Sequence, residues 1–313
     1  MIFVPIFTFH HCRLEHIAYG TYIVTPFRVV FDTNAFTPEK FDLLEKGPLI
    51  RLCNSGRIVP IYGNVFLEET FRAYGSEGKR QALVDRWIPF ILSTVNRFCD
   101  DFLGIWHREL VQGQGPKTNI FMSPVDQSRL IERLPAIPLD GSWRAWHASK
   151  YARDIENEKR LAQRETSKAI RQEVADWRKM IRYDPKTHGI SRLDRYFENE
   201  VENAGRDFLV ALVKCKDPNA VASRWARSKG QYPYFTTFVI NMLYIAHHAM
   251  TKVNSRIDLN AQADLDVMTH LLRADALVTN EGGFMSQAFD DLWRPKGKVK
   301  FTSEQFANLV QSF

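Results

Sequence analysis

Acidic side chains follow the strand-like runs of this sequence or lie in the helices beside them. Asp32 directly follows Phe27–Phe31, a β-branched and aromatic run that is typical of a parallel strand covered on both faces. Ligands of open α/β sheets bind outside the carboxyl ends of the strands, so acids at such places would meet in one crevice. A cluster of carboxylates can hold Mg²⁺ or Mn²⁺, which can shield a phosphodiester, activate a water and stabilise the leaving oxygen. The other acids at comparable places are Glu68, Glu69, Asp264, Asp266 and Glu281.

Two of these places hold a pair of acids, and helical periodicity favours one member of each pair. Glu69 shares a helical face with apolar residues, whereas Glu68 lies about 100° away. Asp264 continues an apolar stripe, whereas Asp266 lies about 200° from it. The apolar neighbours that define the two faces are Val65 and Phe66 for Glu69, and Val267, Met268, Leu271 and Leu272 for Asp264.

Strands are expected to alternate with helices around these acids. A helical pattern runs from Pro38 to Asn54 and ends at Ser55-Gly56, and Ser303 is expected to cap a closing helix. Strand, helix, strand, helix is a right-handed crossover pair, so we expect an α/β fold with a parallel sheet flanked by helices. The predicted strands are Phe27–Phe31, Arg57–Ile61, Asp275–Thr279 and Lys298–Thr302.

Residues 77–255 contain almost no strand-like run and are predicted to form a large α-helical insertion. Trp87–Leu110 is expected as an amphipathic helix and Phe235–Met250 as an apolar core helix. Between them, Trp143–Arg182 has the pattern of a long polar helix in which basic residues outnumber acidic ones. This helix is either solvated and laced with i,i+4 ion pairs or an arm that contacts nucleic acid. The second alternative would use Lys168 and Arg171 on phosphates, and Trp143 and Trp146 on bases.

The whole chain bounds the class of protein. Its 313 residues can bury a full core, and a net charge of +6 favours an acidic partner such as nucleic acid. The four scattered cysteines are typical of reduced thiols, and no apolar run is long enough for a membrane span, so a cytoplasmic location is expected. Residues 1–26 are either an edge element or an upstream extension. The sequence leaves the formation of a homo-oligomer open.

The order of the acidic motifs resembles that of the PIN-domain nucleases. Those enzymes have Asp-Thr-Asn/Ser after the first strand, a Glu in the second helix, an Asp opening a later helix and Val-Thr-x-Asp after the fourth strand. The matching segments here are Asp32-Thr33-Asn34, Glu69 or Glu68, Asp264 or Asp266, and Val278-Thr279-Asn280-Glu281. The resemblance implies a PIN-like core formed by residues 27–76 and 256–313 and interrupted by the insertion.

The resemblance also implies roles for these residues. The protein would be a metal-dependent nuclease acting on RNA or single-stranded DNA, with one or two Mg²⁺ or Mn²⁺ ions. Asp32, Glu69, Asp264 and Glu281 would be the catalytic metal ligands, with Glu68 and Asp266 as alternates. Four polar residues would orient the carboxylates and the attacking water: Thr33, Asn34, Thr279 and Asn280.

The sequence departs from the family pattern in two respects and leaves alternatives open. The last acid is usually Asp, and Glu281 is one methylene longer; the minimal family members also lack the insertion. A strand-end Asp32 followed by Thr33 and Asn34 is equally typical of a helix cap or turn. A haloacid-dehalogenase-type phosphatase would need an Asp where Asn34 stands. A non-catalytic nucleic-acid-binding or scaffold protein that keeps a PIN fold is the remaining alternative.

Overall fold

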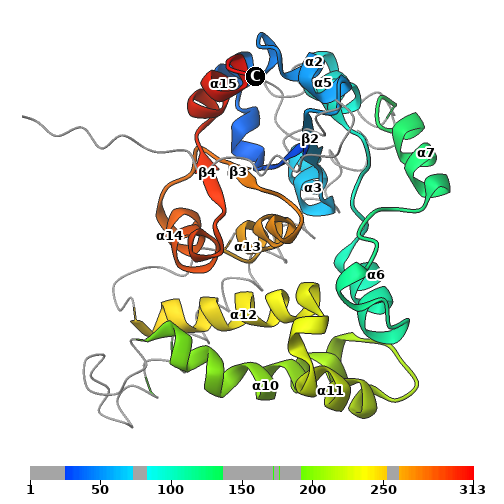
Figure 1. The fold of residues 1–313 in the computed structure, drawn as a ribbon, viewed down its shortest axis with the longest axis vertical. Coiled ribbons are helices and arrows are strands. Elements are labelled where there is room, and N and C mark those ends of the chain that lie inside the picture. The colour runs from blue at the N-terminus through cyan, green and yellow to red at the C-terminus, as the bar shows by residue number, and fades with distance from the viewer. Residues whose placement is uncertain (1–24, 73–82, 137–171, 173–175, 177–191, 252–260) are drawn as a thin grey trace, which may run out of the picture.

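A four-stranded, all-parallel sheet lies at the centre of the α/β part of the molecule (Figure 1). The strands are β1 (Phe27–Phe31), β2 (Ile58–Ile61), β3 (Ala276–Val278) and β4 (Val299–Phe301), and their order in the sheet is β2-β1-β3-β4. The predicted parallel α/β sheet is therefore confirmed, although the last three strands are shorter than the sequence indicates. The computed structural model describes residues 25–72, 83–136, 172, 176, 192–251 and 261–313.

The sheet separates two hydrophobic clusters. Val29 and Phe31 of β1 and Val278 of β3 contribute to one cluster, whereas Val30 and Leu277 contribute to the other. This division follows from the alternation of side chains along each strand. Both faces of the sheet are therefore covered, which explains why β1 has no polar alternation. The helices in the first cluster include α1 (Pro38–Glu45), α2 (Leu49–Asn54) and α15 (Ser303–Gln311), and those in the second include α13 (Ala261–Thr269) and α14 (Gly283–Leu292).

Two helix boundaries differ from the sequence prediction. The single helix expected over Pro38–Asn54 is two helices, α1 and α2, separated by Lys46-Gly47-Pro48. Proline has no amide hydrogen and disfavours a helical conformation in the residue before it, so Pro48 begins a new helix instead of continuing the first. The closing helix α15 is capped by Thr302 rather than by Ser303, because the Thr302 hydroxyl accepts the amide of Gln305 in a reciprocal capping box.

The described middle of the chain is helical apart from isolated β-bridges. Phe98 bridges to Tyr62, and Cys99 bridges to Phe121. The prediction of one continuous amphipathic helix over Trp87–Leu110 is wrong. The chain leaves the helix at Val95, and Cys99 then bridges to Phe121. The elements are η3 (Leu83–Trp87), α5 (Ile88–Thr94), α6 (Phe102–Trp106), η4 (His107–Val111), η5 (Gly115–Lys117), α7 (Pro124–Arg133), α10 (Leu193–Leu212), α11 (Pro218–Arg227), η6 (Lys229–Gln231) and α12 (Pro233–Thr251).

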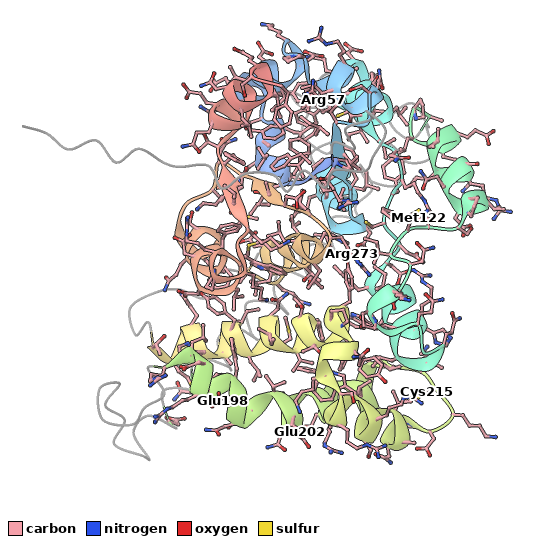
Figure 2. All side chains as sticks on the ribbon, viewed as in Figure 1. Arg57, Met122, Glu198, Glu202, Cys215 and Arg273 are labelled. Atoms are coloured by element: carbon pink, nitrogen blue, oxygen red, sulfur yellow. The ribbon has the colours of Figure 1, made fainter. Side chains whose placement is uncertain are left out.

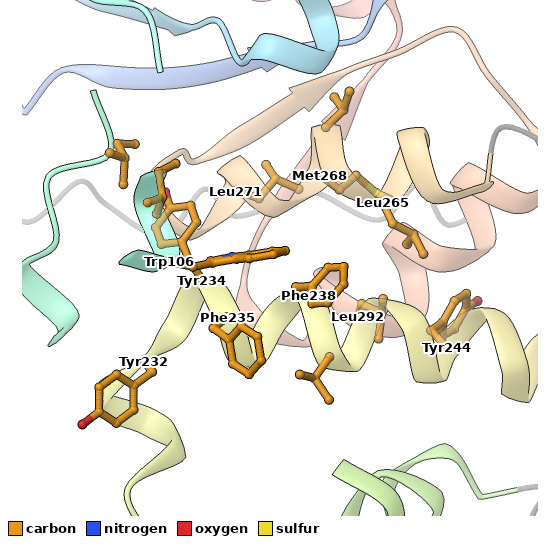
Figure 3. Close-up of a cluster of buried hydrophobic side chains, with 14 of the residues drawn as sticks. Trp106, Tyr232, Tyr234, Phe235, Phe238, Tyr244, Leu265, Met268, Leu271 and Leu292 are labelled. Carbon is orange, nitrogen blue, oxygen red and sulfur yellow. The ribbon is translucent and has the colours of Figure 1, made fainter. Parts of the chain in front are cut away.

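Helix α12 is the core helix that the apolar run predicted. It packs on α10 on one side and on α13 on the other (Figure 1). Figure 3 shows Phe238 of α12 facing Leu265 and Met268 of α13, and all three side chains belong to one buried cluster. Within the described part of the chain, no helix is long and apolar enough to cross a membrane.

Several predicted features lie outside the described residues. These are residues 1–24 of the N-terminal segment, nearly all of the polar helix Trp143–Arg182, and the four residues proposed to bind nucleic acid, Lys168, Arg171, Trp143 and Trp146. Their predicted roles stay predictions.

We expect Gly205→Ala to destabilise the fold by about 1–3 kcal/mol, the range typical of overpacking a close-packed core. A Cβ at Gly205 of α10 would lie 2.0 Å from the indole of Trp225, which is fully buried. The intrinsic preference of helices for Ala over Gly would predict the opposite sign. Gly230→Ala is the control, since no atom lies within 4 Å of its added Cβ. Urea unfolding measures both, and equal stability of the two variants would contradict the expected overpacking.

Candidate carboxylate site

Asp32 is buried where β1 ends and is bonded to the end of β3. Its side chain is 5 % exposed, and its Oδ2 accepts a hydrogen bond from the Thr279 hydroxyl at 2.8 Å. Its backbone amide donates to the Val278 carbonyl at 3.0 Å. The carboxyl ends of two adjacent parallel strands therefore meet at Asp32, as expected for a strand-end residue in an open α/β sheet.

The pKa of Asp32 is raised to about 7. Burial is the largest cause, and the hydrogen bond from Thr279 acts against it. The negative charges of Glu281 and Glu69 raise the pKa further, so both are close enough to act on Asp32. Asp32 is therefore the predicted ligand on which the charges of two others, Glu69 and Glu281, act.

Glu69 and Glu281 approach Asp32 from different elements. Glu69 lies on α3 (Asn64–Arg72), is half-buried and accepts a hydrogen bond from the Thr33 hydroxyl at 2.9 Å. Glu281 is exposed in the loop after β3, and its backbone amide donates to the Thr279 hydroxyl at 3.0 Å. The side chain of the alternate residue Glu68 lies outside what the structure describes. Thr33 and Thr279 thus each donate a hydrogen bond to a carboxylate, and their supporting role stays a prediction.

Asn34 and Asn280 connect three segments of the chain. The Asn34 Oδ1 accepts the Asn280 amide at 2.8 Å, and the Asn280 Nδ2 donates to the Asn34 carbonyl at 3.2 Å. Asn280 also exchanges two hydrogen bonds with Ser303, from its Nδ2 to the hydroxyl at 2.8 Å and from the Ser303 amide to its Oδ1 at 3.0 Å. Both asparagines are thus engaged in holding the strand ends together.

Ser303 is the member of this network that sequence reasoning missed. It is fully buried, and we predicted it as a helix cap. Its position shortly after β4 is the signal that could have found it, because the carboxyl end of β4 lies at the same edge of the sheet as Asp32 and Thr279.

Asp264 and Asp266 both lie on α13, which packs against α3 and β1. Asp264 is 8 % exposed, in agreement with its predicted place on the apolar stripe. Asp266 is half-buried rather than on an open face, and burial raises its pKa to about 7 against a hydrogen bond from Gln262. The helix therefore does not separate the two acids as sharply as the 200° between them suggests.

The oxygen atoms of this site suit a hard divalent cation, but they do not form a closed coordination shell. In the part of the chain that the structure describes, no three His, Cys, Asp or Glu side chains are arranged to hold a metal ion. Asp32, Glu69 and Glu281 are the acids whose charges interact, and Asp264 is on a helix next to that of Glu69. Charge interaction therefore links Asp32 to Glu69 and Glu281, whereas Asp264 is related to them only through the packing of α13 against α3 and β1.

A second buried carboxylate, Glu109, was not singled out by the sequence. It is fully buried on η4, and its two oxygens accept the backbone amides of Tyr234 and Phe235, at 3.0 and 2.9 Å, at the start of α12. Burial raises its pKa to about 7, against these two bonds and the charge of Arg273. Because the partners are more than 100 residues away, no local pattern indicates this helix cap.

The comparisons with known proteins add no further identification. No protein-family model, curated protein or solved structure matches this chain. The resemblance to the PIN-domain nucleases therefore rests on the motifs and on the site residues described above, and the assignment stays a hypothesis.

Proposed function

We propose that this chain is a metal-dependent nuclease of the PIN-like type that hydrolyses phosphodiester bonds of RNA or single-stranded DNA. One observation carries the proposal: Asp32 is buried at a strand end, which raises its pKa to about 7, and the negative charges of Glu281 and Glu69 add to this shift. Perturbed carboxyl groups that face other acids are characteristic of functional sites, because a fold gains nothing from such repulsion alone.

Oxygen donors and mutual repulsion both suit a divalent cation at this place. Asp32, Glu69, Asp264 and Glu281 would hold Mg²⁺ or Mn²⁺, with Glu68 and Asp266 as alternates. A bound cation would neutralise charge on the phosphate and lower the pKa of a water.

The polar residues of the chain would orient the acids. Thr279 donates to Asp32, and Thr33 donates to Glu69, which fixes one oxygen of each carboxylate. Two hydrogen bonds between Asn280 and Ser303 hold the segments that follow β3 and β4 together. Such supporting hydrogen bonds typically change metal affinity or activity by about 10–100-fold when removed.

We also propose that the protein acts in the cytoplasm. Cys53, Cys99 and Cys215 are free thiols, and free thiols persist in reducing compartments.

The test of the nuclease proposal is cleavage of end-labelled single strands of RNA and of DNA by the purified protein. Manganese should support cleavage and EDTA should stop it, because the carboxylates would act through a bound divalent cation that activates the attacking water. Cleavage that continues in EDTA would contradict a carboxylate-metal site. Tight binding without cleavage in any divalent metal would favour the non-catalytic nucleic-acid-binding alternative instead.

Within the same assay, we expect Asp264→Asn to abolish cleavage and Asp266→Asn to leave most of it. Asp264 is the more deeply buried of the two and is the acid placed on the apolar stripe of α13. The two variants differ by one charge each on the same helix, so each is a control for the other. The reverse result would transfer the ligand role to Asp266 and change the site assignment.

A further inference from the structure

Four basic residues occupy alternate positions between α14 and the end of β4. They are Arg294, Lys296, Lys298 and Lys300, and we call the three lysines the basic strip. Arg294 belongs to η8 (Arg294–Lys296) and pairs with Asp290 at 2.7 Å, so its charge is already balanced. The lysines have no such ion pair among the described salt bridges.

Lys300 lies in β4, an edge strand of the described sheet, and Lys298 and Lys296 precede that strand. Lys300 pairs in register with Leu277, whose side chain belongs to the cluster that includes α14. Its ammonium lies 5.9 Å from the ring of Phe289 on α14, and that of Lys296 lies 4.4 Å from the ring of Trp293. Lys300 lies in β4 with Lys298 just before it, and residues two apart in extended backbone are about 6.6–6.8 Å apart, whereas Lys296 ends η8 and is separated from them by the left-handed turn at Gly297.

The strip leads to the loop that carries Glu281. Lys300 donates to the Ser286 hydroxyl, and the Ser286 hydroxyl donates to the Glu281 carbonyl at 3.1 Å. One end of the strip is thus linked through one side chain to the backbone of a residue of the carboxylate site. Its other end, at Lys296, is exposed beyond the start of β4.

The acids near the strip have other partners. Asp290 pairs with Arg294, the carboxylate of Asp291 accepts the hydroxyl of Tyr244 at 2.7 Å, and Asp275 accepts the amide of Arg28 at 2.8 Å. Partial burial of the ammonium group lowers the pKa of Lys296 and of Lys298; repulsion from Lys298 lowers that of Lys296 further, whereas the charge of Asp275 opposes the shift of Lys298. Clustered, partly desolvated ammonium groups favour binding of an anion.

We propose that Lys296, Lys298 and Lys300 bind successive phosphates of a single-stranded nucleic acid and guide that strand along β4 to the carboxylates. This inference rests on the proposed nuclease function for the identity of its ligand. The charge of the strip complements a phosphate backbone, and its position along and just before the edge strand β4 would let a single strand run beside the sheet edge. The opposing interpretation is that these lysines only protect an exposed edge strand from pairing with other chains.

The experiment measures binding of a fluorescent single-stranded oligonucleotide by the full chain in EDTA, so that no cleavage is required. The variant Lys296→Gln/Lys300→Gln removes two of the proposed contacts and leaves the Lys298 bond to the Ala274 carbonyl intact. The control is Lys214→Gln/Lys216→Gln, which removes two exposed lysines beside Cys215, far from the sheet (Figures 1 and 2). Fluorescence anisotropy is recorded over a series of salt concentrations.

We expect the strip variant to bind about 25-fold more weakly at about 0.1 M salt and to lose about 1.4 from the slope of log K against log salt, since each single-strand contact contributes about 0.7. The control variant should keep the wild-type slope. Wild-type affinity and slope in the strip variant would overturn the inference and leave edge protection, even if the protein is a nuclease. Loss of binding in a protein without nuclease activity would support the strip and reject the proposed function.

A second measurement separates nucleic acid from other anionic surfaces. Sedimentation with vesicles of phosphatidylserine and phosphatidylcholine should leave the protein in solution. Strip-dependent binding to these vesicles but not to the oligonucleotide would overturn the inference.

Discussion

Asp32→Asn is expected to lower the rate of cleavage by about a thousandfold while it raises the melting temperature of the metal-free protein. Charge stabilisation by a metal contributes several kcal/mol, and each 1.4 kcal/mol is a factor of ten in rate. The pKa of Asp32 is about 7 in the fold, against 3.8 for the ordinary side chain. Ionised Asp32 therefore destabilises the fold by about 4 kcal/mol. Asparagine has almost the same shape and removes this charge, so part of that free energy returns to the fold.

Thermal unfolding with and without manganese measures the second half of this prediction. A ligand that binds only the folded protein adds about 2.7 kcal/mol at 100 times its dissociation constant, which raises the melting temperature by several degrees. We expect this increase to shrink in Asp32→Asn, because the variant lacks one of the proposed ligands.

Asp207→Asn is the matched control, since Asp207 is exposed on α10 and outside the site. It should keep wild-type activity and the wild-type response to manganese. If Asp32→Asn melts below the wild type without metal, and manganese stabilises both equally, Asp32 has a structural role and the nuclease proposal loses its main support.

Glu109→Gln is expected to change how the stability of the fold depends on pH. The pKa of Glu109 is about 7 in the fold, against 4.5 for the ordinary side chain. Between these values the folded protein binds more protons than the unfolded chain, so the free energy of unfolding falls as the pH rises, by about 3 kcal/mol from this group. The glutamine variant removes this part of the decline.

The curves for wild type and Glu109→Gln should cross as the pH rises. Below about pH 5 the variant is the less stable, by about 1 kcal/mol, because the amide nitrogen cannot accept one of the two backbone amides of α12. Above about pH 8 the variant is the more stable, because it does not bury a charge. Urea unfolding at a series of pH values measures both.

Glu132→Gln on α7 serves as the comparison, because Glu132 is exposed. Its curve should follow that of the wild type. Parallel curves for wild type and Glu109→Gln would mean that Glu109 titrates in the fold as it does in the unfolded chain. Asp32 and Asp266 also have raised pKa values, so the wild-type decline should not disappear completely in Glu109→Gln.

The strands could be predicted from the sequence because each is a short apolar run with its own ending. The runs that became β1 and β3 were recognised with the polar residues Asp32 and Thr279 that follow them, and the structure joins these two residues by a hydrogen bond. Parallel pairing then determines that the ends lie at one edge of the sheet. This part of the site depends on local sequence and on a general rule of topology.

The remaining features depend on contacts between distant segments. Glu109 caps α12 across 125 residues, and Ser303 bonds to Asn280 on the neighbouring strand. The break in the predicted helix Trp87–Leu110 coincides with the pairing of Cys99 with Phe121. Asp266 is half-buried because α13 contacts α12 and α14 as well as the sheet, so more than one stripe of this helix is covered. Helical periodicity within one segment contains no information about these partners.

The central pairing of the sheet has a consequence for the newly synthesised protein. Asp32 and Thr279 are separated by 247 residues, and a ribosome adds about 5–20 residues per second. During synthesis, about 12–50 s therefore pass between the addition of Asp32 and that of Thr279. Until β3 leaves the ribosome, β1 lacks one of its two neighbours and the carboxylates are not assembled. A nascent chain from which β3 has not yet emerged would consequently be inactive as the proposed nuclease.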